Sequence, residues 1–410
     1  MPRDPHASGQ SESDSIGARI RARRLTRKNW SIRYIADRAG LDNSYLSRVE
    51  RGERAINNRF VLNRLAAALE CSVADLTGQP YVPADQELET AHRWVHSTRH
   101  SLLSLDLAEP AEAGPTRHID QVAAEADLIA ALRRSCDYAG ITSRLPALLD
   151  ELYAHATRGG ETERALSLLI GVGNAAAYTL SRLGYPGDGY VAARIGHEAG
   201  QHLGDPVSRG VADFALAHAV GGGGGAYRRM LTIADRATGR LSAVKDTPDS
   251  LETRGMLTLT AATGHLGVGD VTRARDALAE AKQIAGVTGE RGGWSHFGPT
   301  NASFWEVALE VDMGNPGRAV EIARTVQPSA VDSPSRQVAF HLDVARALTS
   351  LRGRHHEATR QLLTAERLAP QRTRSAPHAR ETARELAETA KKAAVGPDLR
   401  GFCERAGVAV

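Results

Sequence analysis

The sequence has few cysteines and few aromatic side chains, and it lacks long apolar runs. Its three cysteines, Cys71, Cys136 and Cys403, lie far apart without metal-ligand spacing, which predicts packed or idle thiols in a reducing compartment. No run of about 18 uncharged apolar residues is present, so we expect no membrane-spanning helix. The polar N-terminus lacks the apolar core of a secretory signal. These absences predict a cytoplasmic protein without a membrane partner.

Complete catalytic motifs are also missing. The run 168–176 contains G-x-G-x-x-A, which in a strand-to-helix turn would hold a pyrophosphate, but the residues before it have helical spacing. A zinc-protease-like string begins at His356, but Arg360 stands where the second histidine is required. We therefore predict no catalytic residues, no cofactor and no metal. A nucleotide-using enzyme is the alternative that the glycine motif leaves open.

Positive charge is concentrated near the N-terminus. Residues 1–80 contain 14 Lys and Arg against 9 Asp and Glu, whereas the rest of the chain contains 37 against 39. Arginine supplies nearly all of this excess, and its planar fork suits phosphates and guanine edges. The distribution therefore predicts a nucleic-acid contact in the first fifth of the chain.

The segment 31–52, SIRYIADRAGLDNSYLSRVERG, has the pattern of two short helices joined by a tight turn. Ser31 and Asp42 are good N-caps for these helices, and Gly40 provides the positive φ that the turn needs. The apolar positions that would lock the two helices together are Ile35, Ala39, Leu41, Leu46 and Val49. With one helix expected before the segment and two after it, the pattern predicts a helix-turn-helix.

From Ile16 to about Leu76 the sequence resembles the Cro/C1-type (XRE) helix-turn-helix family, in which the third helix enters the major groove of DNA. The resemblance implies base-reading roles for Asn43, Ser44, Ser47 and Arg48. It implies phosphate contacts by Ser31, Arg33, Arg51, Arg54, Asn58 and Arg59. The family often has Gln where this chain has Ile32, and Arg33 is the candidate replacement. The alternative is a helix-turn-helix that only packs against proteins.

The second part of the chain, from about His118, is rich in Ala and Leu at helical spacing, so the whole chain is predicted to be all-α. Three segments repeat a glycine followed by small or apolar residues five, nine and twelve positions later: Gly269, Ala274, Leu278 and Ala281; Gly314, Ala319, Ala323 and Val326; Gly353, Ala358, Leu362 and Ala365. A glycine in the turn and a small residue at the crossing are typical of antiparallel helix pairs. The pattern resembles divergent tetratricopeptide repeats over roughly residues 120–395, which form a superhelix with a concave binding face.

The segment 292–306, GGWSHFGPTNASFWE, holds two of the four tryptophans. An aromatic loop between repeat helices predicts a ligand pocket, in which rings give contact area and polar groups orient the ligand. The pocket residues would be Trp294, His296, Phe297, Asn301 and Trp305. The alternative is that these aromatic side chains fill a gap between repeats.

These patterns predict a disordered tail over 1–14, a five-helix Cro/C1-type DNA-binding domain over 15–79, a linker with a connecting helix over 80–117, and a tetratricopeptide-like helical-repeat domain over 118–410. The FGPTN string and the later AERLAP resemble bacterial regulators that join an XRE domain to a degenerate tetratricopeptide domain. That resemblance implies a sequence-specific transcription regulator, of secondary metabolism or development, whose second domain senses a ligand, dimerises or both.

The expected partners follow from this interpretation. They are a double-stranded, palindromic DNA operator, a second copy of the chain in a homodimer, and an unidentified small molecule, peptide or protein bound by the repeat domain. The alternative function is a tetratricopeptide-type scaffold for protein interactions in which DNA contact is secondary.

Overall fold

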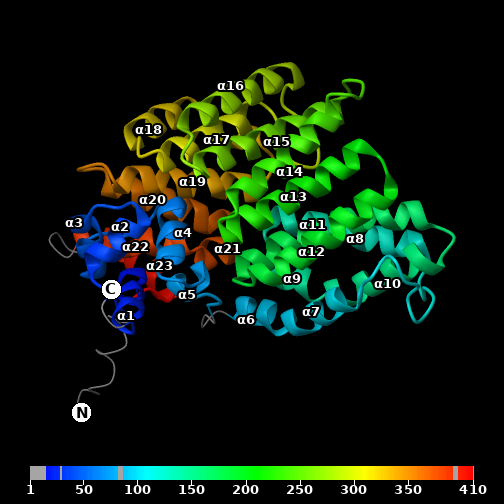
Figure 1. The fold of residues 1–410 in the computed structure, drawn as a ribbon, viewed down its shortest axis with the longest axis horizontal. Coiled ribbons are helices and arrows are strands. Elements are labelled where there is room, and N and C mark those ends of the chain that lie inside the picture. Colours follow the sequence, from blue (N-terminus) through cyan, green and yellow to red (C-terminus); the bar gives the residue numbers. More distant parts are fainter. Residues whose placement is uncertain (1–14, 28–29, 82–85, 391–395, 410) are drawn as a thin grey trace, which may run out of the picture.

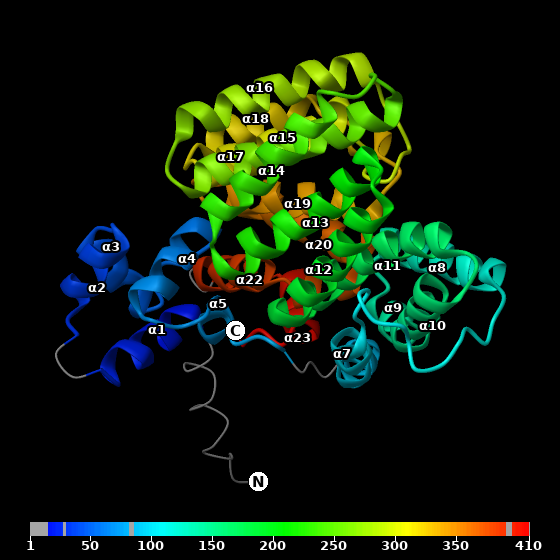
Figure 2. The same cartoon turned by 45° about the vertical axis from the view of Figure 1, so that its right-hand side comes forward.

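The computed structural model describes residues 15–27, 30–81, 86–390 and 396–409, and the tail predicted over 1–14 lies outside this part. Within these ranges the regular structure is helical, with no strand, which confirms the predicted all-α class. None of the helices described is both long and apolar enough to cross a membrane. Figures 1 and 2 show a small N-terminal unit lying against one side of a much larger one.

The small unit, called the head below, contains five helices: α1 (Ile16–Leu25), α2 (Ile32–Ala39), α3 (Asn43–Glu50), α4 (Arg59–Ala68) and α5 (Val73–Thr77). Their apolar faces meet in one core, in which Ile20, Ile35, Leu46 and Leu65 are fully buried. This core is distinct from that of the rest of the chain. The head is therefore held together by its own hydrophobic contacts.

The local signals of the helix-turn-helix form as the sequence indicates. The side chains of Ser31 and Asp42 each accept a backbone N–H of the helix that follows, which satisfies donors left open at the N-termini of α2 and α3. Gly40 ends α2 with a φ of 62°, a left-handed conformation that side chains disfavour. The predicted pair of helices, its caps and its turn are confirmed.

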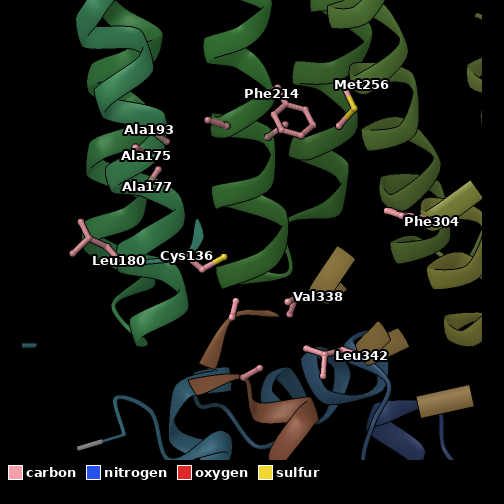
Figure 3. Close-up of a cluster of buried hydrophobic side chains, with 14 of the residues drawn as sticks. Cys136, Ala175, Ala177, Leu180, Ala193, Phe214, Met256, Phe304, Val338 and Leu342 are labelled. Atoms are coloured by element: carbon pink, nitrogen blue, oxygen red, sulfur yellow. The ribbon is translucent and has the colours of Figure 1, made fainter. Parts of the chain in front are cut away.

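The large unit, called the body below, consists of helices that pack mainly against their neighbours in the chain. They are α8 (Ile119–Ser135), α9 (Tyr138–Thr142), α10 (Leu145–Arg158), α11 (Thr162–Leu183), α12 (Pro186–Leu203), α13 (Pro206–Gly224), α14 (Tyr227–Leu241), α15 (Pro248–Gly267), α16 (Val271–Thr288), α17 (Pro299–Asp312), α18 (Pro316–Thr325), the 3-10 helix η1 (Pro328–Ala330), α19 (Pro334–Thr349), α20 (His355–Leu368), α21 (Pro370–Ser375), α22 (Pro377–Ala390) and α23 (Pro397–Arg405). The chain ends beside the head, because α22 and α23 return to that side of the body (Figure 2). Figure 3 shows part of the hydrophobic core that these helices share, to which Phe214 of α13, Met256 of α15 and Leu342 of α19 contribute.

The three glycine-based repeats correspond to three helix pairs, α15–α16, α17–α18 and α19–α20. The turn glycines Gly269, Gly314 and Gly353 have φ values of 86°, 84° and 77°. The small residues five positions later, Ala274, Ala319 and Ala358, are each 0% exposed. The glycines therefore make the turns and the alanines permit the close helix crossings, which confirms the predicted repeat pattern.

Two helices rather than one connect the head to the body: α6 (Gln86–Arg93) and α7 (Val95–Ser104). They pack on the body, α6 against α9 and α7 against α10 and α12. Nδ1 of His92 on α6 lies 3.0 Å from the hydroxyl oxygen of Tyr185. Across the described ranges no cluster of His, Cys, Asp and Glu is arranged to hold a metal ion.

The glycine motif within 168–176 lies in the middle of α11, which is continuous from Thr162 to Leu183. The structure therefore lacks the strand-to-helix turn that a pyrophosphate site would require at this motif. Gly173 instead lets α12 approach, since an added Cβ would lie 3.1 Å from the carbonyl oxygen of Ala192 and 3.3 Å from Cα of Gly196. Gly171 faces open space, because a Cβ added there would have no neighbouring atom within 4 Å.

We expect opposite effects from two alanine substitutions in this helix. Gly171→Ala should raise the free energy of unfolding by about 0.5–1 kcal/mol, because alanine loses less backbone entropy than glycine in a helix. Gly173→Ala should lower it by about 1–3 kcal/mol, because α11 and α12 must separate. Urea denaturation followed by circular dichroism measures both, and equal effects would contradict a packing role for Gly173.

Candidate nucleic-acid interface

Helix α3 lies on the side of the head that points away from the body (Figures 1 and 2). The side chains of Asn43, Ser44 and Arg48 are exposed on this helix, and Ser47 is half-buried. The structure therefore places the four predicted base readers together, on a helix that the body leaves uncovered.

The N-terminus of α3 is organised by the carboxylate of Asp42. This carboxylate accepts hydrogen bonds from the hydroxyl of Ser44 and, at 3.0 Å, from the backbone N–H of Tyr45. These bonds, the one from Ser44 first, hold the pKa of Asp42 below its usual value, so the cap stays ionised at neutral pH. Arg48 makes a long bond of 3.4 Å from Nε to the carbonyl oxygen of Ser44, which leaves the rest of its guanidinium facing solvent.

Four of the predicted phosphate contacts lie at or near the surface around α3. Ser31 caps α2, and the three arginines have partners within the head: Asp37 for Arg33 at 3.9 Å, Glu53 for Arg51 at 2.6 Å, and the ring of Tyr45 for Arg54 at 4.9 Å from its centroid. Ion pairs between exposed side chains contribute only about 0–1 kcal/mol. A phosphate could therefore replace these partners at little cost.

The position of α3 also depends on a buried ion pair that the sequence pattern did not single out. Arg24 at the end of α1 donates from Nε and Nη2 to the two carboxylate oxygens of Glu50, both at 2.7 Å. These residues are 9% and 6% exposed. A bidentate pair of this kind fixes orientation as well as distance, so it sets the angle of α3 relative to α1. An arginine one turn after the buried Ile20 is the sequence signal that could have revealed it.

The region with this geometry matches a known family: residues 20–76 match the helix-turn-helix family model. The N-terminal domain is a helix-turn-helix domain of the Cro/C1 type. Among solved structures, the chain is similar to PlcR of Bacillus thuringiensis in complex with the peptide PapR7 and DNA, with 15% identity and a TM-score of 0.34 over 67% of this chain and 95% of that chain. No curated protein matches the sequence.

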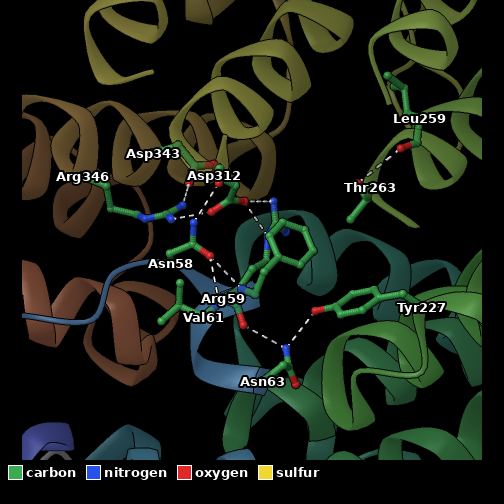
Figure 4. A network of polar contacts seen from close by, with 11 residues as sticks. Asn58, Arg59, Val61, Asn63, Tyr227, Leu259, Thr263, Asp312, Asp343 and Arg346 are labelled. Atoms are coloured by element: carbon green, nitrogen blue, oxygen red, sulfur yellow. Dashed lines mark hydrogen bonds and ion pairs between the residues drawn. The ribbon is translucent and has the colours of Figure 1, made fainter. Parts of the chain in front are cut away.

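The other two predicted phosphate contacts, Asn58 and Arg59, hold the helix-turn-helix domain against the body (Figure 4). Arg59 donates from Nε to Oδ2 of Asp312 at 2.7 Å, and Asn58 donates from Nδ2 to the carbonyl oxygen of Asp312 at 2.8 Å. The other oxygen of Asp312, Oδ1, accepts from Nη2 of Arg346 at 2.7 Å, and Arg346 also binds Asp343. Sequence reasoning could not find this partner, because Asp312 lies more than two hundred residues away.

The electrostatics of this junction favour an ionised Asp312. Burial acts to raise the pKa of this carboxyl group, but the guanidinium groups of Arg59 and Arg346 lower it further than burial raises it. Asp343 shows the opposite balance, because burial raises its pKa against the pull of Arg346. The charge that binds Arg59 to the body is therefore that of Asp312.

Two further contacts join helix α4 to α14 of the body. The amide of Asn63 donates from Nδ2 to the hydroxyl of Tyr227 at 2.8 Å (Figure 4). The rings of Phe60 and Tyr227 lie 5.1 Å apart, and Phe60 packs with the core of the body rather than with that of the helix-turn-helix domain. The junction therefore combines an ion pair, a neutral hydrogen bond and an aromatic contact.

The aromatic loop predicted to line a ligand pocket divides into two groups. Phe297 is fully buried against α15, where a Cβ on Gly255 would lie 2.0 Å from its ring, and Asn301 donates to the carbonyl oxygens of Ser295 and His296. These two residues hold the loop in place. Trp294, His296 and Trp305 are half-buried and keep accessible surface. The pocket itself stays a prediction.

Glu385 on α22 lies in the seam between the helix-turn-helix domain and the body. Its Oε2 accepts a hydrogen bond from Nδ2 of Asn57 at 3.0 Å. Burial is the main cause that raises the pKa of Glu385 to about 7, while Arg54 acts against it and the charge of Glu381 adds to it. This carboxyl group therefore titrates near neutral pH.

We expect the stability of the chain to depend on pH through Glu385. Because its pKa is higher in the folded protein than in the unfolded chain, its stabilising effect is complete at about pH 4.5 and is lost as the pH rises through about 7. Between about pH 5 and pH 8.5 the wild type should therefore lose about 1–2 kcal/mol more than Glu385→Gln. Thermal unfolding at both pH values measures the difference, with Glu280→Gln on the exposed face of α16 as control. Parallel pH profiles for wild type and Glu385→Gln would contradict the assignment.

Proposed function

We propose that the chain is a sequence-specific DNA-binding transcription regulator that reads its operator with Asn43, Ser44, Ser47 and Arg48. The observation that carries this proposal is that three of these side chains are exposed and Ser47 is half-buried on α3, in a helix-turn-helix domain whose α3 points away from the body. In such domains this part of the helix lies against base edges in the major groove. Asn can pair with adenine and Arg with guanine through two hydrogen bonds each.

The phosphate contacts in this proposal come from Ser31, Arg33, Arg51 and Arg54 around α3, with Asn58 and Arg59 at the N-terminus of α4. The ion pairs of Arg33 with Asp37 and of Arg51 with Glu53 are exposed and weak. Such contacts position the protein on DNA, while the base readers supply the sequence preference. Positive charge concentrated in this part of the chain supports the same assignment.

The proposed regulator acts as a homodimer on a palindromic operator in the cytoplasm. Two helix-turn-helix domains related by a two-fold axis read half-sites that lie about 34 Å apart, one turn of DNA. The body dimerises, senses a small molecule, peptide or protein, or does both, and a ligand changes DNA binding only where it favours one arrangement of the two domains. Control of secondary metabolism or development is the biological role that the resemblance to bacterial regulators supports.

The first experiment tests the base readers. Selection of bound oligonucleotides from a random pool defines the operator, and Asn43→Ala and Arg48→Ala should then each lose about 1–3 kcal/mol of preference for that operator over random DNA. Arg236→Ala, which removes an exposed arginine on α14, is the matched control and should bind like the wild type.

The same assay separates the proposal from its alternative. An unchanged preference in both variants would reject these base readers, and failure of the pool to converge on any sequence would favour the scaffold. Light scattering of the chain with and without the selected operator gives the stoichiometry. A monomer in both states would contradict the dimer.

A second prediction follows from the use of Arg59 and Asn58 by the body. If these groups bind phosphates, DNA must compete with Asp312 for them, and weaker docking should strengthen DNA binding. Tyr227→Phe removes the hydrogen bond from Asn63, worth about 0.5–1.5 kcal/mol, while its ring keeps the contact with Phe60. We expect a rise of about two- to tenfold in operator affinity by fluorescence anisotropy, and none for Tyr190→Phe on the surface of α12. Equal affinities for wild type and Tyr227→Phe would contradict the competition.

A further inference from the structure

Four arginines from four helices of the body converge without a carboxylate partner. They are Arg133 on α8, Arg182 on α11, Arg336 on α19 and Arg372 on α21, called the arginine cluster below. Helix α8 packs against α11 and α19, and α11 packs against α21, so the four side chains come from adjoining elements. Among the described residues, none of the four guanidinium groups forms a salt bridge, and their hydrogen bonds go to neutral oxygens: Arg133 to the carbonyl of Trp294 at 3.3 Å and Arg372 to the hydroxyl of Ser335.

The four groups act on one another electrostatically. Burial is the largest cause that lowers the pKa of Arg336 to about 10, and the positive charges of Arg133 and Arg372 lower it further. Burial and then Arg372 likewise lower the pKa of Arg182. Yet the side chain of Arg182 is exposed, and those of the other three are only half-buried. Solvent therefore reaches all four guanidinium-bearing side chains, although three of them are partly covered by protein.

Two of the most deeply buried arginines of this chain are paired with carboxylates. Arg24 binds Glu50, and Arg346 binds both Asp312 and Asp343. An enclosed charge without a partner is costly, which is why folded proteins rarely keep one. The four arginines of the cluster have no such carboxylate partner among the described residues, and solvent reaches them.

Helix dipoles account for part of the cluster but not for Arg336. Arg133 and Arg182 lie in the last turns of their helices, and Arg372 lies near the end of α21, where the dipole favours a cation. Arg336 lies in the first turn of α19, where the dipole disfavours one. Its position is therefore unfavourable twice, through the dipole and through Arg133 and Arg372, unless an anion lies beside it.

The groups around the cluster include one carboxylate and several rings. Glu252 is fully buried, its Oε1 accepts from Ser295, and its single charge does not offset four guanidinium groups. The hydroxyl of Tyr178 has no hydrogen-bond partner among the described residues; burial raises its pKa to about 12, and the charges of Arg336, Arg133 and Arg182 act against this rise. His218 is neutral, because burial, with help from Arg336, lowers its pKa to about 3.

Aromatic side chains extend from this point toward the loop of residues 292–306. The ring of Phe214 lies 4.5 Å from that of His218 and 5.1 Å from that of Trp294, and the ring of Trp305 lies 5.7 Å from His218. Trp294 also accepts the hydrogen bond of Arg133 at its carbonyl. An apolar, ring-lined surface therefore adjoins the cationic groups.

We propose that the arginine cluster is the ligand site of the body and binds an oxyanion with two or more negative charges, a phosphate or carboxylate compound, through Arg336, Arg133, Arg182 and Arg372. Guanidinium groups form paired hydrogen bonds with both kinds of oxyanion. An apolar part of the ligand would lie against Trp294 and Trp305, which keep accessible surface. A regulatory role for this site rests on the function proposed above. The link to DNA binding is helix α19, which carries Arg336 and also Arg346, and Arg346 holds Asp312 at the junction with the helix-turn-helix domain.

The test uses the full chain with two probe anions, tripolyphosphate and citrate, and sodium chloride at equal ionic strength as the control. Titration calorimetry should show binding of one or both probes at one site per chain, and thermal unfolding should move to higher temperature with the bound probe only. A response to tripolyphosphate alone assigns a phosphate compound, and a response to citrate alone assigns a carboxylate. Heat and stabilisation that match those of sodium chloride would overturn the proposal.

Arg336→Gln separates binding from a structural role. It should bind the probe at least tenfold more weakly, and without the probe it should unfold at the same or a higher temperature than wild type, because it removes an unpaired charge. Arg236→Gln, on the exposed side of α14, is the matched control and should bind normally. Arg182→Gln, at an exposed side chain, should weaken binding as well and is the second variant if Arg336→Gln does not fold.

Unchanged probe affinity in both variants would overturn the proposal, because the probe would then bind elsewhere, for example on the basic helix-turn-helix domain. The operator assay is run on the same samples. If the chain binds its operator but not the probe, only the proposed ligand site is wrong. If it binds the probe but prefers no DNA sequence, the proposed regulator is wrong and the chain is an anion-binding protein.

Discussion

The arrangement of the whole chain depends on the carboxylate of Asp312, which lies between two arginines. One oxygen binds Arg59 of the helix-turn-helix domain and the other binds Arg346 of α19. The side chains of Asp312 and Arg346 are both buried, so removing Arg346 would leave part of the charge of Asp312 unpaired, and such losses cost about 3–5 kcal/mol in buried pairs. The same carboxylate thus completes the interior of the body and fixes where the DNA-binding domain lies. Because Arg59 and Asn58 bind Asp312, the domain is held against the body through the same groups that we propose for DNA phosphate contacts.

Much of the fold could be predicted from the sequence because its signals are local. A left-handed turn at Gly40, Gly269, Gly314 or Gly353 strongly favours a residue without Cβ, and this preference does not depend on anything distant in the chain. Capping by Asp42 and the apolar spacing of α2 and α3 are local in the same sense. The glycine motif within 168–176 illustrates the limit, since its short pattern fits a phosphate loop while the longer helical spacing around it decides the structure.

The candidate sites were less predictable because their partners are distant in sequence. The resemblance to Cro/C1 domains implied phosphate contacts for Asn58 and Arg59, and no residue near them in the sequence indicates their contact with Asp312. Within the aromatic loop, residue types alone could not separate Asn301, which fixes the backbone, from Trp294, which keeps accessible surface. The arginine cluster was invisible for a related reason, since arginines are common at helix ends and only the fold shows that four of them converge without a carboxylate.

Helix α19 gives the two halves of the molecule a physical connection. Arg336 stands in its first turn and Arg346 stands ten residues later, about 15 Å along the axis, so the cluster and the junction share one rigid element. In the coupling that we propose, a bound anion would draw Arg336 toward Arg133 and Arg372 and shift α19, and this shift would change how well Arg346 supports Asp312. Linkage makes the effect reciprocal: if anion binding weakens the hold on Arg59 by a given factor, release of Arg59 onto DNA strengthens anion binding by the same factor. The coupling needs no contact between ligand and DNA, only a helix that carries an unpaired arginine at one end and an arginine bound to Asp312 at the other.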